Sequence, residues 1–362
     1  MDSLCRLWQG RAGTRPPRSY PRAGDISFIP QGRGHGMRVL VTGGAGFIGT
    51  HLCRRLLADG NAVSVVDNEF NGNRDNLPPE VHFTLGDVAR PEEVEPAFAR
   101  GLDAVCHIAG QVSIIRSFTN PVLDLRTNVE GTLNVLQLCL KYKVPRLIYA
   151  SSMTIYGNGG MVPTPETDRC WPDSYYGITK LAGERFVHAT AERPDIGFDF
   201  KVTSLRMYSV YGPGQALDNP YQGVLGIFLG NIMRGEPITV FGDGEQTRDF
   251  VYIGDIVEGW ARALSSAATA GQAINLGSGR SLTINQLAEA AIHACGGNGK
   301  IIRAPARPGE QRSVQADVSK ARALMGWEPR TPFEAGLEET LRWARQEVAA
   351  NPAAQASRSA AR

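Results

Sequence analysis

A strand, a glycine-rich turn and the start of a helix follow one another in residues 39–49, which read Val-Leu-Val-Thr-Gly-Gly-Ala-Gly-Phe-Ile-Gly. A turn of this kind places backbone amides and the positive end of a helix dipole where a pyrophosphate can bind. Glycines keep the turn tight and let the phosphate approach the backbone. The segment therefore predicts a dinucleotide-binding fold, with contacts from Gly43, Gly46, Phe47, Ile48 and Gly49.

The next apolar run, residues 62–67, ends in Asp67, roughly twenty residues beyond the turn. A carboxylate there can accept hydrogen bonds from both ribose hydroxyls of a dinucleotide, and it repels a 2′-phosphate. We therefore expect NAD rather than NADP. Nearby Arg74 leaves NADP as an alternative, and Asp67 could instead be a simple turn residue at a strand end.

Beyond this turn, β-branched apolar runs alternate with helical patterns, which is typical of a parallel sheet. We expect an α/β protein with a Rossmann-type, doubly wound parallel sheet. The predicted strands are 38–42, 62–67, 81–86, 104–108, 146–150 and 201–206, with helices such as 46–59 and 122–139 between them. Glycine and proline become denser after residue 210, which indicates a smaller C-terminal substrate-binding cap domain.

Composition divides the chain into four segments. Residues 1–36 are rich in arginine, proline and glycine, and we expect a disordered basic tail or a mis-assigned start before Met37. Residues 37–210 are predicted to form the NAD-binding domain. Residues 211–345 are predicted to form mainly the cap, with some segments returning to the sheet, and 346–362 a second disordered tail.

The formal net charge of +2 and the absence of a basic stripe argue against nucleic acid as a partner. No apolar run is long enough to span a bilayer, so we do not expect a membrane role. The six cysteines are scattered, without Cys-x-x-Cys spacing or a His-rich partner segment. This pattern predicts no metal site and reduced thiols in a cytoplasmic protein.

Tyr176 and Lys180 are four residues apart, about one helical turn, so we expect them on one face of a helix. An ammonium at that distance can lower the pKa of the phenol and make Tyr176 a base near neutral pH. The spacing alone is weak evidence, because many exposed helices carry it. Downstream of a dinucleotide turn it predicts redox chemistry.

Several further motifs occur in an order typical of one large enzyme family. They are Gly-Asp-Val at 86–88, His-Ile-Ala-Gly at 107–110, Asn-Val-Glu-Gly-Thr at 128–132, Ser-Ser-Met-Thr-Ile-Tyr-Gly at 151–157, Arg-Asp-Phe-Val at 248–251 and Arg-Pro-Gly-Glu at 307–310. With the glycine turn, Tyr176 and Lys180, they make the chain from Met37 to Leu341 closely resemble the extended short-chain dehydrogenase/reductase family. Within it, the resemblance is to NAD-dependent nucleotide-sugar epimerases and dehydratases, and in motif to UDP-glucose 4-epimerase-like enzymes.

The resemblance implies roles that spacing does not assign. Asp87 and Val88 would hold the adenine, Ala109 and Gly110 would line the pyrophosphate and ribose, and Asn128 and Tyr208 would lie near the nicotinamide. Ser152 would be the catalytic hydroxyl residue, which can donate a hydrogen bond to a sugar oxygen as charge develops on it. His107 is expected to be a packing residue at its strand end.

Two positions bear on the reaction. Family dehydratases carry an Asp-Glu pair directly after the catalytic hydroxyl residue, where this chain has Met153 and Thr154. Neither side chain can deliver a proton to a leaving hydroxide, so a standard dehydratase is disfavoured. The related decarboxylases usually place a glutamate at the position of Thr154, which weakens that alternative too.

We therefore expect a nucleotide-sugar 4-epimerase, acting on a UDP- or dTDP-hexose, with Ser152, Tyr176 and Lys180 as the catalytic residues. The sugar would be oxidised at C4 and reduced again from the opposite face. Another reaction of the same family on a nucleotide sugar remains open: dehydration, decarboxylation, reduction or epimerisation at C5. A catalytically silent, NAD-sensing binding protein is a remote alternative, because such a protein would not need the complete catalytic set.

The resemblance also implies how the substrate is held. Arg248 and Arg307 would grip the diphosphate, which suits the fork geometry of guanidinium groups, and Glu310 would meet the nucleoside ribose. Residues 238–242 would line the base. Two departures affect the sugar site: Ser209 stands where the epimerases more often have asparagine, after Met207 in place of an aromatic residue, and Val314 replaces a bulky tyrosine found in some members. We expect Ser209 to reach a phosphate weakly and Val314 to leave room for 2-acetamido sugars.

The family forms homodimers built on two helices from each subunit. By resemblance, we expect a homodimer here, with the helices that follow Pro121 and Tyr175 as the candidates.

Overall fold

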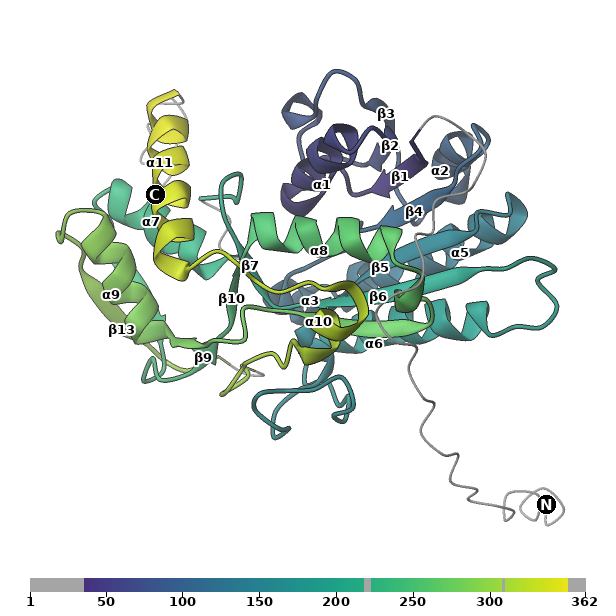
Figure 1. Ribbon diagram of the computed structural model, residues 1–362. Coiled ribbons are helices and arrows are strands. Elements are labelled where there is room, and N and C mark those ends of the chain that lie inside the picture. The colour runs from purple at the N-terminus through teal and green to yellow at the C-terminus, as the bar shows by residue number, and fades with distance from the viewer. Residues whose placement is uncertain (1–35, 218–222, 308–309, 351–362) are drawn as a thin grey trace, which may run out of the picture.

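The computed structural model of this 362-residue chain describes residues 36–217, 223–307 and 310–350 (Figure 1). The tail predicted over residues 1–36 lies outside these ranges except for its last residue, and so do Pro308 and Gly309. The described chain forms a larger lobe around a parallel sheet and a smaller lobe beside it, at the left of Figure 1.

The seven strands of the large sheet are all parallel and lie in the order β11-β6-β5-β4-β1-β2-β3. They are β1 (Arg38–Thr42), β2 (Ala62–Asp67), β3 (His82–Leu85), β4 (Ala104–His107), β5 (Arg146–Ser152), β6 (Lys201–Met207) and β11 (Gln272–Leu276). The predicted Rossmann-type, doubly wound sheet is confirmed. The strand order reverses between β1 and β4, and in such sheets ligands bind at the carboxyl ends of the strands beside this point.

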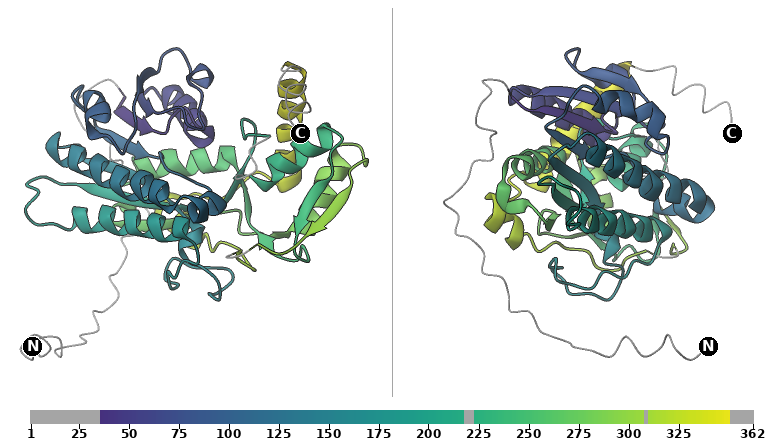
Figure 2. Two further views of the ribbon diagram at one scale, coloured as in Figure 1. Left: turned by 180° about the vertical axis from the view of Figure 1, so that it is seen from behind. Right: turned by 90° about the vertical axis from the view of Figure 1, so that its right-hand side faces the viewer.

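Helices cover both faces of the sheet (Figure 1, Figure 2). They bury its apolar side chains. One face is covered by α1 (Phe47–Ala58), α8 (Ile253–Ser265) and α10 (Ser319–Met325), with Trp260 and Trp327 among the side chains in this core. The other face is covered by α2 (Pro91–Phe98), α5 (Gly131–Lys141) and α6 (Tyr175–Ala191). Because both faces are buried, the strands are almost continuously apolar, as in β1 and β4.

One predicted helix, 122–139, consists of three parts. It comprises α4 (Pro121–Leu125), a π-helical turn η2 (Arg126–Glu130) and α5. The short helix α3 (Ile114–Thr119) precedes it, and Asn120 caps α4 by accepting the Leu123 N–H. A π turn inside a helix commonly marks a functional site, and this one carries Asn128.

The smaller lobe is built on three two-stranded pairs. Strand β7 (Ser209–Tyr211) pairs with β10 (Phe250–Tyr252), β8 (Ile238–Phe241) with β13 (Ile301–Ala304), and β9 (Thr247–Arg248) with β12 (Leu282–Thr283). Helices α7 (Val224–Met233), α9 (Ile284–Ala294) and α11 (Phe333–Ala350) pack around them. Short 3-10 turns occur at η1 (Arg74–Asn76), η3 (Met153–Ile155) and η4 (Ala267–Thr269).

Two further differences from the sequence analysis concern strand β11 and the C-terminal helix α11. Strand β11 was not predicted, because its sequence Gln-Ala-Ile-Asn-Leu carries two amides and has no clear strand pattern; it completes the large sheet beside β6. The tail predicted from residue 346 is wrong over 346–350, because α11 continues to Ala350. Its alanines are good helix formers, so composition misled the boundary.

Candidate active site

The turn after β1 has a backbone that only glycine fits. Gly43 adopts a positive φ of 71°, and a Cβ there would lie 2.7 Å from the backbone nitrogen of Ala109. A Cβ on Gly49 would collide with the Gly43 carbonyl oxygen. Gly46 is the N-cap of α1 and brings no side chain to its first amides. These amides are therefore open to an anion, as the sequence predicts.

A cavity of about 250 Å³ lies at this turn, at the carboxyl ends of β1, β2 and β4. Its lining includes most of the residues predicted to bind the cofactor, namely Gly43, Gly46, Phe47, Ile48, Gly49, Asp67, Asp87, Val88, Ala109 and Gly110. Gln215 also lines it from the segment after β7, and its buried Oε1 has no hydrogen-bond partner among the described residues. Open amides, an acid and an unpartnered acceptor fit the phosphates and hydroxyls of a dinucleotide.

Asp67 ends β2 at the edge of this cavity. Its carboxylate accepts the N–H groups of Ala45 (3.0 Å) and Glu69 (2.8 Å), while its burial raises the pKa against these hydrogen bonds. Arg74, the cation that kept NADP as an alternative cofactor, is not in the lining of this cavity. Its guanidinium pairs with Glu69 and stacks 4.5 Å from the Phe83 ring centroid. The described lining of the cavity thus contains an acid and no cation for a 2′-phosphate.

The predicted catalytic residues meet at the carboxyl end of β5. Tyr176 and Lys180 lie one turn apart on α6, and Ser152 is the last residue of β5. All three side chains are buried, and Ser152 makes a side-chain hydrogen bond with Tyr176. A Cβ on Gly110 would stand 3.5 Å from Lys180 Nζ, so the ammonium borders the cofactor cavity.

The expectation that the pKa of Tyr176 lies near neutral pH is wrong for this structure. Burial raises the pKa of Tyr176 to about 12, although the hydrogen bond with Ser152 opposes the rise. Burial lowers the pKa of Lys180 to about 8, and the carboxylates of Asp124 and Glu184 limit this decrease. The sequence shows that the two groups are neighbours, but it does not show how deeply they are buried.

Asn128 and Tyr208 are not in the lining of the first cavity. Asn128 lies on η2, where its Oδ1 accepts the Gln111 N–H (2.8 Å) and its Nδ2 donates to Thr179 Oγ1 (3.1 Å). It is thus a buried residue next to Gly110. Tyr208 lines a second cavity, so the structure brings it to a different place from the predicted cofactor residues.

This second cavity, of about 290 Å³, is lined by Met153, which directly follows the predicted catalytic residue Ser152. Met153, Tyr156, Tyr208, Gln311 and Val314 line it, together with parts of the loop 157–168. Asp168 is the single acid in the described lining, and its carboxylate is held by the N–H groups of Met161 (2.8 Å) and Arg169 (2.7 Å). Val314 is buried and faces this space, whereas Ser209 is half-buried on β7 and outside the lining.

The predicted substrate-binding charges lie together in the smaller lobe. Arg248 donates to Glu310 Oε1 (2.9 Å) and to the carbonyl oxygen of Gln311 (2.8 Å). The Arg307 guanidinium stacks 3.7 Å from the Phe241 ring centroid, at the end of the predicted base-lining segment. Arg248 and Glu310, predicted to hold different parts of a nucleotide, are thus paired with each other.

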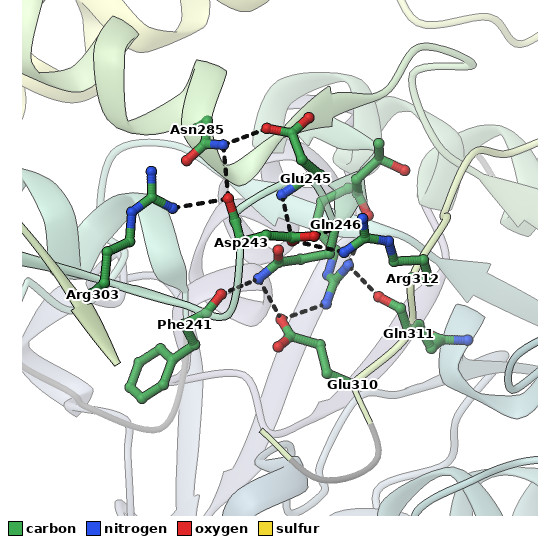
Figure 3. A network of polar contacts seen from close by, with 11 residues as sticks. Phe241, Asp243, Glu245, Gln246, Asn285, Arg303, Glu310, Gln311 and Arg312 are labelled. Carbon is green, nitrogen blue, oxygen red and sulfur yellow. Dashed lines mark hydrogen bonds and ion pairs between the residues drawn. The ribbon is translucent and has the colours of Figure 1, made fainter. Parts of the chain in front are cut away.

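Sequence reasoning missed the polar network that supports these residues (Figure 3). Arg312 pairs with Asp243 (2.7 Å), whose carbonyl oxygen accepts hydrogen bonds from Arg303 and Asn285. Gln246 Nε2 bridges the carbonyl oxygen of Phe241 (2.9 Å) and Glu310 (3.4 Å). The Gly-Asp-Gly-Glu-Gln sequence at 242–246 contains no motif that would predict this network.

Among the described residues, no group of three His, Cys, Asp or Glu side chains is arranged to hold a metal ion. None of the helices in the described ranges is both long and apolar enough to cross a bilayer.

Comparison with known proteins connects this geometry to characterised relatives. Residues 39–277 match the model of the NAD dependent epimerase/dehydratase family. A putative UDP-glucose 4-epimerase of Methanocaldococcus jannaschii is 33% identical over 84% of this chain and 97% of its own. UDP-glucuronic acid decarboxylase 2 of Arabidopsis thaliana is 33% identical over 88% of this chain and 71% of its own. A Thermus thermophilus UDP-glucose 4-epimerase, solved in complex with NAD, is 36% identical, with a TM-score of 0.78 over 85% of this chain and 99% of its own.

Proposed function

The chain belongs to the NAD-dependent epimerase/dehydratase family, an extended short-chain dehydrogenase/reductase group, and we propose that within it the protein is a nucleotide-sugar 4-epimerase acting on a UDP- or dTDP-hexose. It is an enzyme whose cofactor is NAD. The relatives include both epimerases and decarboxylases, so the reaction catalysed by this chain is the part that we propose.

The proposed chemistry uses the three residues at the end of β5 and on α6. Tyr176 removes the proton of the 4-hydroxyl group, and Ser152 donates a hydrogen bond to the same oxygen as it becomes a ketone. The Lys180 ammonium favours the phenolate form of Tyr176. NAD, when bound, supplies the acceptor and donor of the C4 hydrogen. The ketosugar then turns in the site, and Tyr176 returns the proton after reduction on the opposite face.

The main support for this proposal comes from the two residues that directly follow Ser152 in the η3 turn, Met153 and Thr154. Thr154 is buried there and its hydroxyl donates to Ser152 Oγ (3.0 Å), while Met153 lines the second cavity. Elimination of water or loss of a carboxyl group calls for an acid or base beside the reacting carbons. The η3 turn supplies a thioether and a hydroxyl already engaged with Ser152, which suffices for oxidation and reduction at C4.

The smaller lobe would hold the nucleotide. Arg248 and Arg307 are cations near a diphosphate site in this proposal, and Glu310 would receive the ribose hydroxyls. Arg248 pairs with Glu310 (2.9 Å), so substrate binding would exchange this contact for contacts with phosphate and ribose. Ser209 would add a weak phosphate contact from β7.

Product analysis by NMR tests the reaction directly. The purified protein would be incubated with UDP-glucose, UDP-galactose, UDP-glucuronate, UDP-N-acetylglucosamine and dTDP-hexoses, without added cofactor. We expect a C4 epimer without release of NADH. A pentose nucleotide from UDP-glucuronate would instead establish the decarboxylase, the second candidate suggested by the Arabidopsis relative. A 4-keto-6-deoxy product would overturn the argument from Met153 and Thr154.

We also propose that the enzyme acts as a homodimer through α4 and α6. These neighbouring helices, with the end of α3, carry exposed apolar side chains that a monomer would leave in water: Phe118, Val122, Leu125, Tyr175, Ile178 and Phe186. The rings of Phe118 and Tyr175 lie 5.4 Å apart and join the two parts of this apolar face. A contiguous apolar face of this kind supports an interface between copies.

A further inference from the structure

A buried carboxylate that the proposed reaction does not use lies beside the catalytic lysine. Asp124, on α4, is fully buried. Its Oδ2 accepts the Thr179 hydroxyl (2.6 Å), and its Oδ1 accepts Gln111 Nε2 and Asn128 Nδ2 (3.4 Å). Buried carboxylates are rare, and a fully hydrogen-bonded one has a specific structural reason.

The orientation of the two amides around Asp124 is fixed by backbone donors. Asn128 Oδ1 accepts the Gln111 N–H (2.8 Å), and Gln111 Oε1 accepts the Ser113 N–H (2.6 Å). Because each amide oxygen faces a donor, each amide NH₂ group has to face Asp124. The Thr179 hydroxyl, whose oxygen accepts Asn128 Nδ2 (3.1 Å), is free to donate as well. Three donors therefore converge on the carboxyl group. The hydrogen bonds of Thr179 and Gln111 favour its anionic form, and they oppose the rise in the pKa of Asp124 that burial causes.

The same three donors reach the active site from three sides. Gln111 lines the cofactor cavity and follows Gly110, where a Cβ would lie 3.5 Å from Lys180 Nζ. Asn128 Oδ1 is 2.9 Å from the place of a Cβ on Gly110. Thr179 immediately precedes Lys180 on α6. Asp124 is thus the common anchor of the cavity wall and the catalytic helix.

We propose that Asp124 is a positioning residue: its buried carboxylate fixes Gln111, Asn128 and Thr179, and it supplies the fixed negative charge beside which Lys180 remains an ammonium. The inference rests on the proposed roles of Tyr176 and Lys180.

The charge acts on Lys180 among a small set of groups. Asp124 acts on it from α4, Glu184 from α6 and His107 from β4, and the Tyr149 ring on β5 has its centroid 4.9 Å from Nζ. Tyr176 lies one turn before Lys180 on α6. Of these groups, Asp124 and Glu184 are the anions, and Glu184 is already paired with Arg206 (2.6 Å). Asp124 raises the pKa of both Lys180 and Tyr176. Removing its charge therefore lowers both pKa values.

Asp124→Asn removes the negative charge of the side chain and keeps its size and most of its hydrogen bonds. The amide oxygen can take over the hydrogen bonds of Oδ1, and the new NH₂ group can donate to Thr179 Oγ1. The Thr179 hydroxyl then turns to the carbonyl oxygen of Tyr176, which lies 3.0 Å away. We expect both limbs of the pH profile of kcat/KM to move to lower pH by about one unit, with the exchange rate of bound NAD against labelled NAD within about threefold of the unsubstituted enzyme.

Asp124→Ala removes the anchor as well as the charge. Two amides and a hydroxyl then lose their acceptor, so we expect the wall of the cofactor cavity to loosen and NAD exchange to accelerate by about tenfold. Asp249→Asn is the matched control. Asp249 is equally buried and accepts donors from Ser278, Gly279 and Ala316, but it belongs to the smaller lobe. It should move neither the pH limbs nor NAD exchange.

The outcomes are distinguishable. A pH profile of Asp124→Asn that coincides with that of the active unsubstituted enzyme overturns the inference and leaves the proposed function intact. An equal shift in Asp249→Asn also overturns it, because the effect would then not depend on proximity to Lys180. An unsubstituted enzyme that turns over none of the nucleotide sugars refutes the proposed function instead.

Discussion

At the scale of a single residue, the burial of Tyr176 opposes the role that we propose for it. Its phenol is buried, which raises its pKa, yet the proposed reaction needs the phenolate. Ser152 and Lys180 are placed to stabilise that form, the first by a hydrogen bond and the second by charge. Ser152 and Lys180, both part of the sequence motifs, would thus offset the effect of burial on the phenolate form of Tyr176.

Tyr176→Phe tests the base. The ring keeps its packing while the hydroxyl is lost, so we expect turnover to fall about a thousandfold or more while NAD remains bound. Turnover is measured by NMR and cofactor content after protein denaturation. Tyr175→Phe, an exposed neighbour on the same helix, serves as the control. Retained activity in Tyr176→Phe would remove the centre of the proposed mechanism.

A second prediction at the level of a single residue concerns Val314, whose side chain lines the second cavity and limits the space in it. Val314→Tyr would fill space beside Tyr208 and Met153. We expect kcat/KM for the UDP-N-acetylglucosamine pair to fall about tenfold relative to the UDP-glucose pair. Competition assays with both sugars measure the ratio. If the unsubstituted enzyme refuses the acetamido sugar altogether, the expected tolerance is wrong.

At the scale of elements, β6 is joined to α6 by a buried ion pair. Arg206 pairs with Glu184 (2.6 Å) and also donates to the Tyr156 hydroxyl (2.8 Å) and the Glu166 carbonyl oxygen (3.1 Å). Ser151 donates to the same Glu184 (2.6 Å). The pair thus connects α6 and β6 with the end of β5 and with the loop that follows it.

The pair predicts a pH dependence of stability. Burial alone would raise the pKa of Glu184, but the hydrogen bonds and charge of Arg206 hold it below the ordinary value. A lowered pKa stabilises the fold above the unfolded-state value of about 4.3, and this contribution is lost as pH falls through the folded-state value. The double variant Glu184→Gln/Arg206→Met should therefore lose less free energy of unfolding between pH 7 and low pH than the unsubstituted protein, as measured by urea unfolding.

The single variant Arg206→Met is the counterpart of this experiment. It leaves Glu184 buried without its partner, which should cost about 3–5 kcal/mol of the free energy of unfolding at pH 7. A loss no larger than that of the double variant would show that the pair does not hold these elements together.

How far the sequence predicts these elements depends on how local their causes are. The six strands from β1 to β6 were predictable, because each is a short run rich in apolar or β-branched residues, and β4, β5 and most of β1, β2 and β6 are buried. Strand β11 was not, since its buried Asn275 side chain has partners that are distant in sequence, namely Tyr156, Thr164 and Asp317. The π turn at Arg126–Glu130 was also missed, because a wider turn leaves the apolar spacing of a helix almost unchanged. Asp124 escaped notice for a similar reason: its partners come from three separate segments.

At the scale of the whole molecule, the apolar face of α4 and α6 predicts the assembly. Ile178→Glu places a charge in the centre of the proposed interface, so we expect the dimer to dissociate to monomers in sedimentation velocity experiments. Leu85→Glu is the control, because Leu85 is even more exposed (59% against 50%) but lies on the edge strand β3, away from this face. Dissociation by both variants, or by neither, would contradict the proposed interface.

The cofactor cavity draws on both lobes, and this has a consequence for melting. Gln215 and Ala216, from the segment that leads into the smaller lobe, line the same space as the glycine turn of the larger one. A dinucleotide bound there would connect two lobes whose apolar cores are largely distinct and share contacts at Tyr252. A ligand at a hundred times its Kd adds about 2.7 kcal/mol to the stability of the state that binds it. Calorimetry should therefore resolve two transitions after NAD is stripped and a single, hotter one when it is restored.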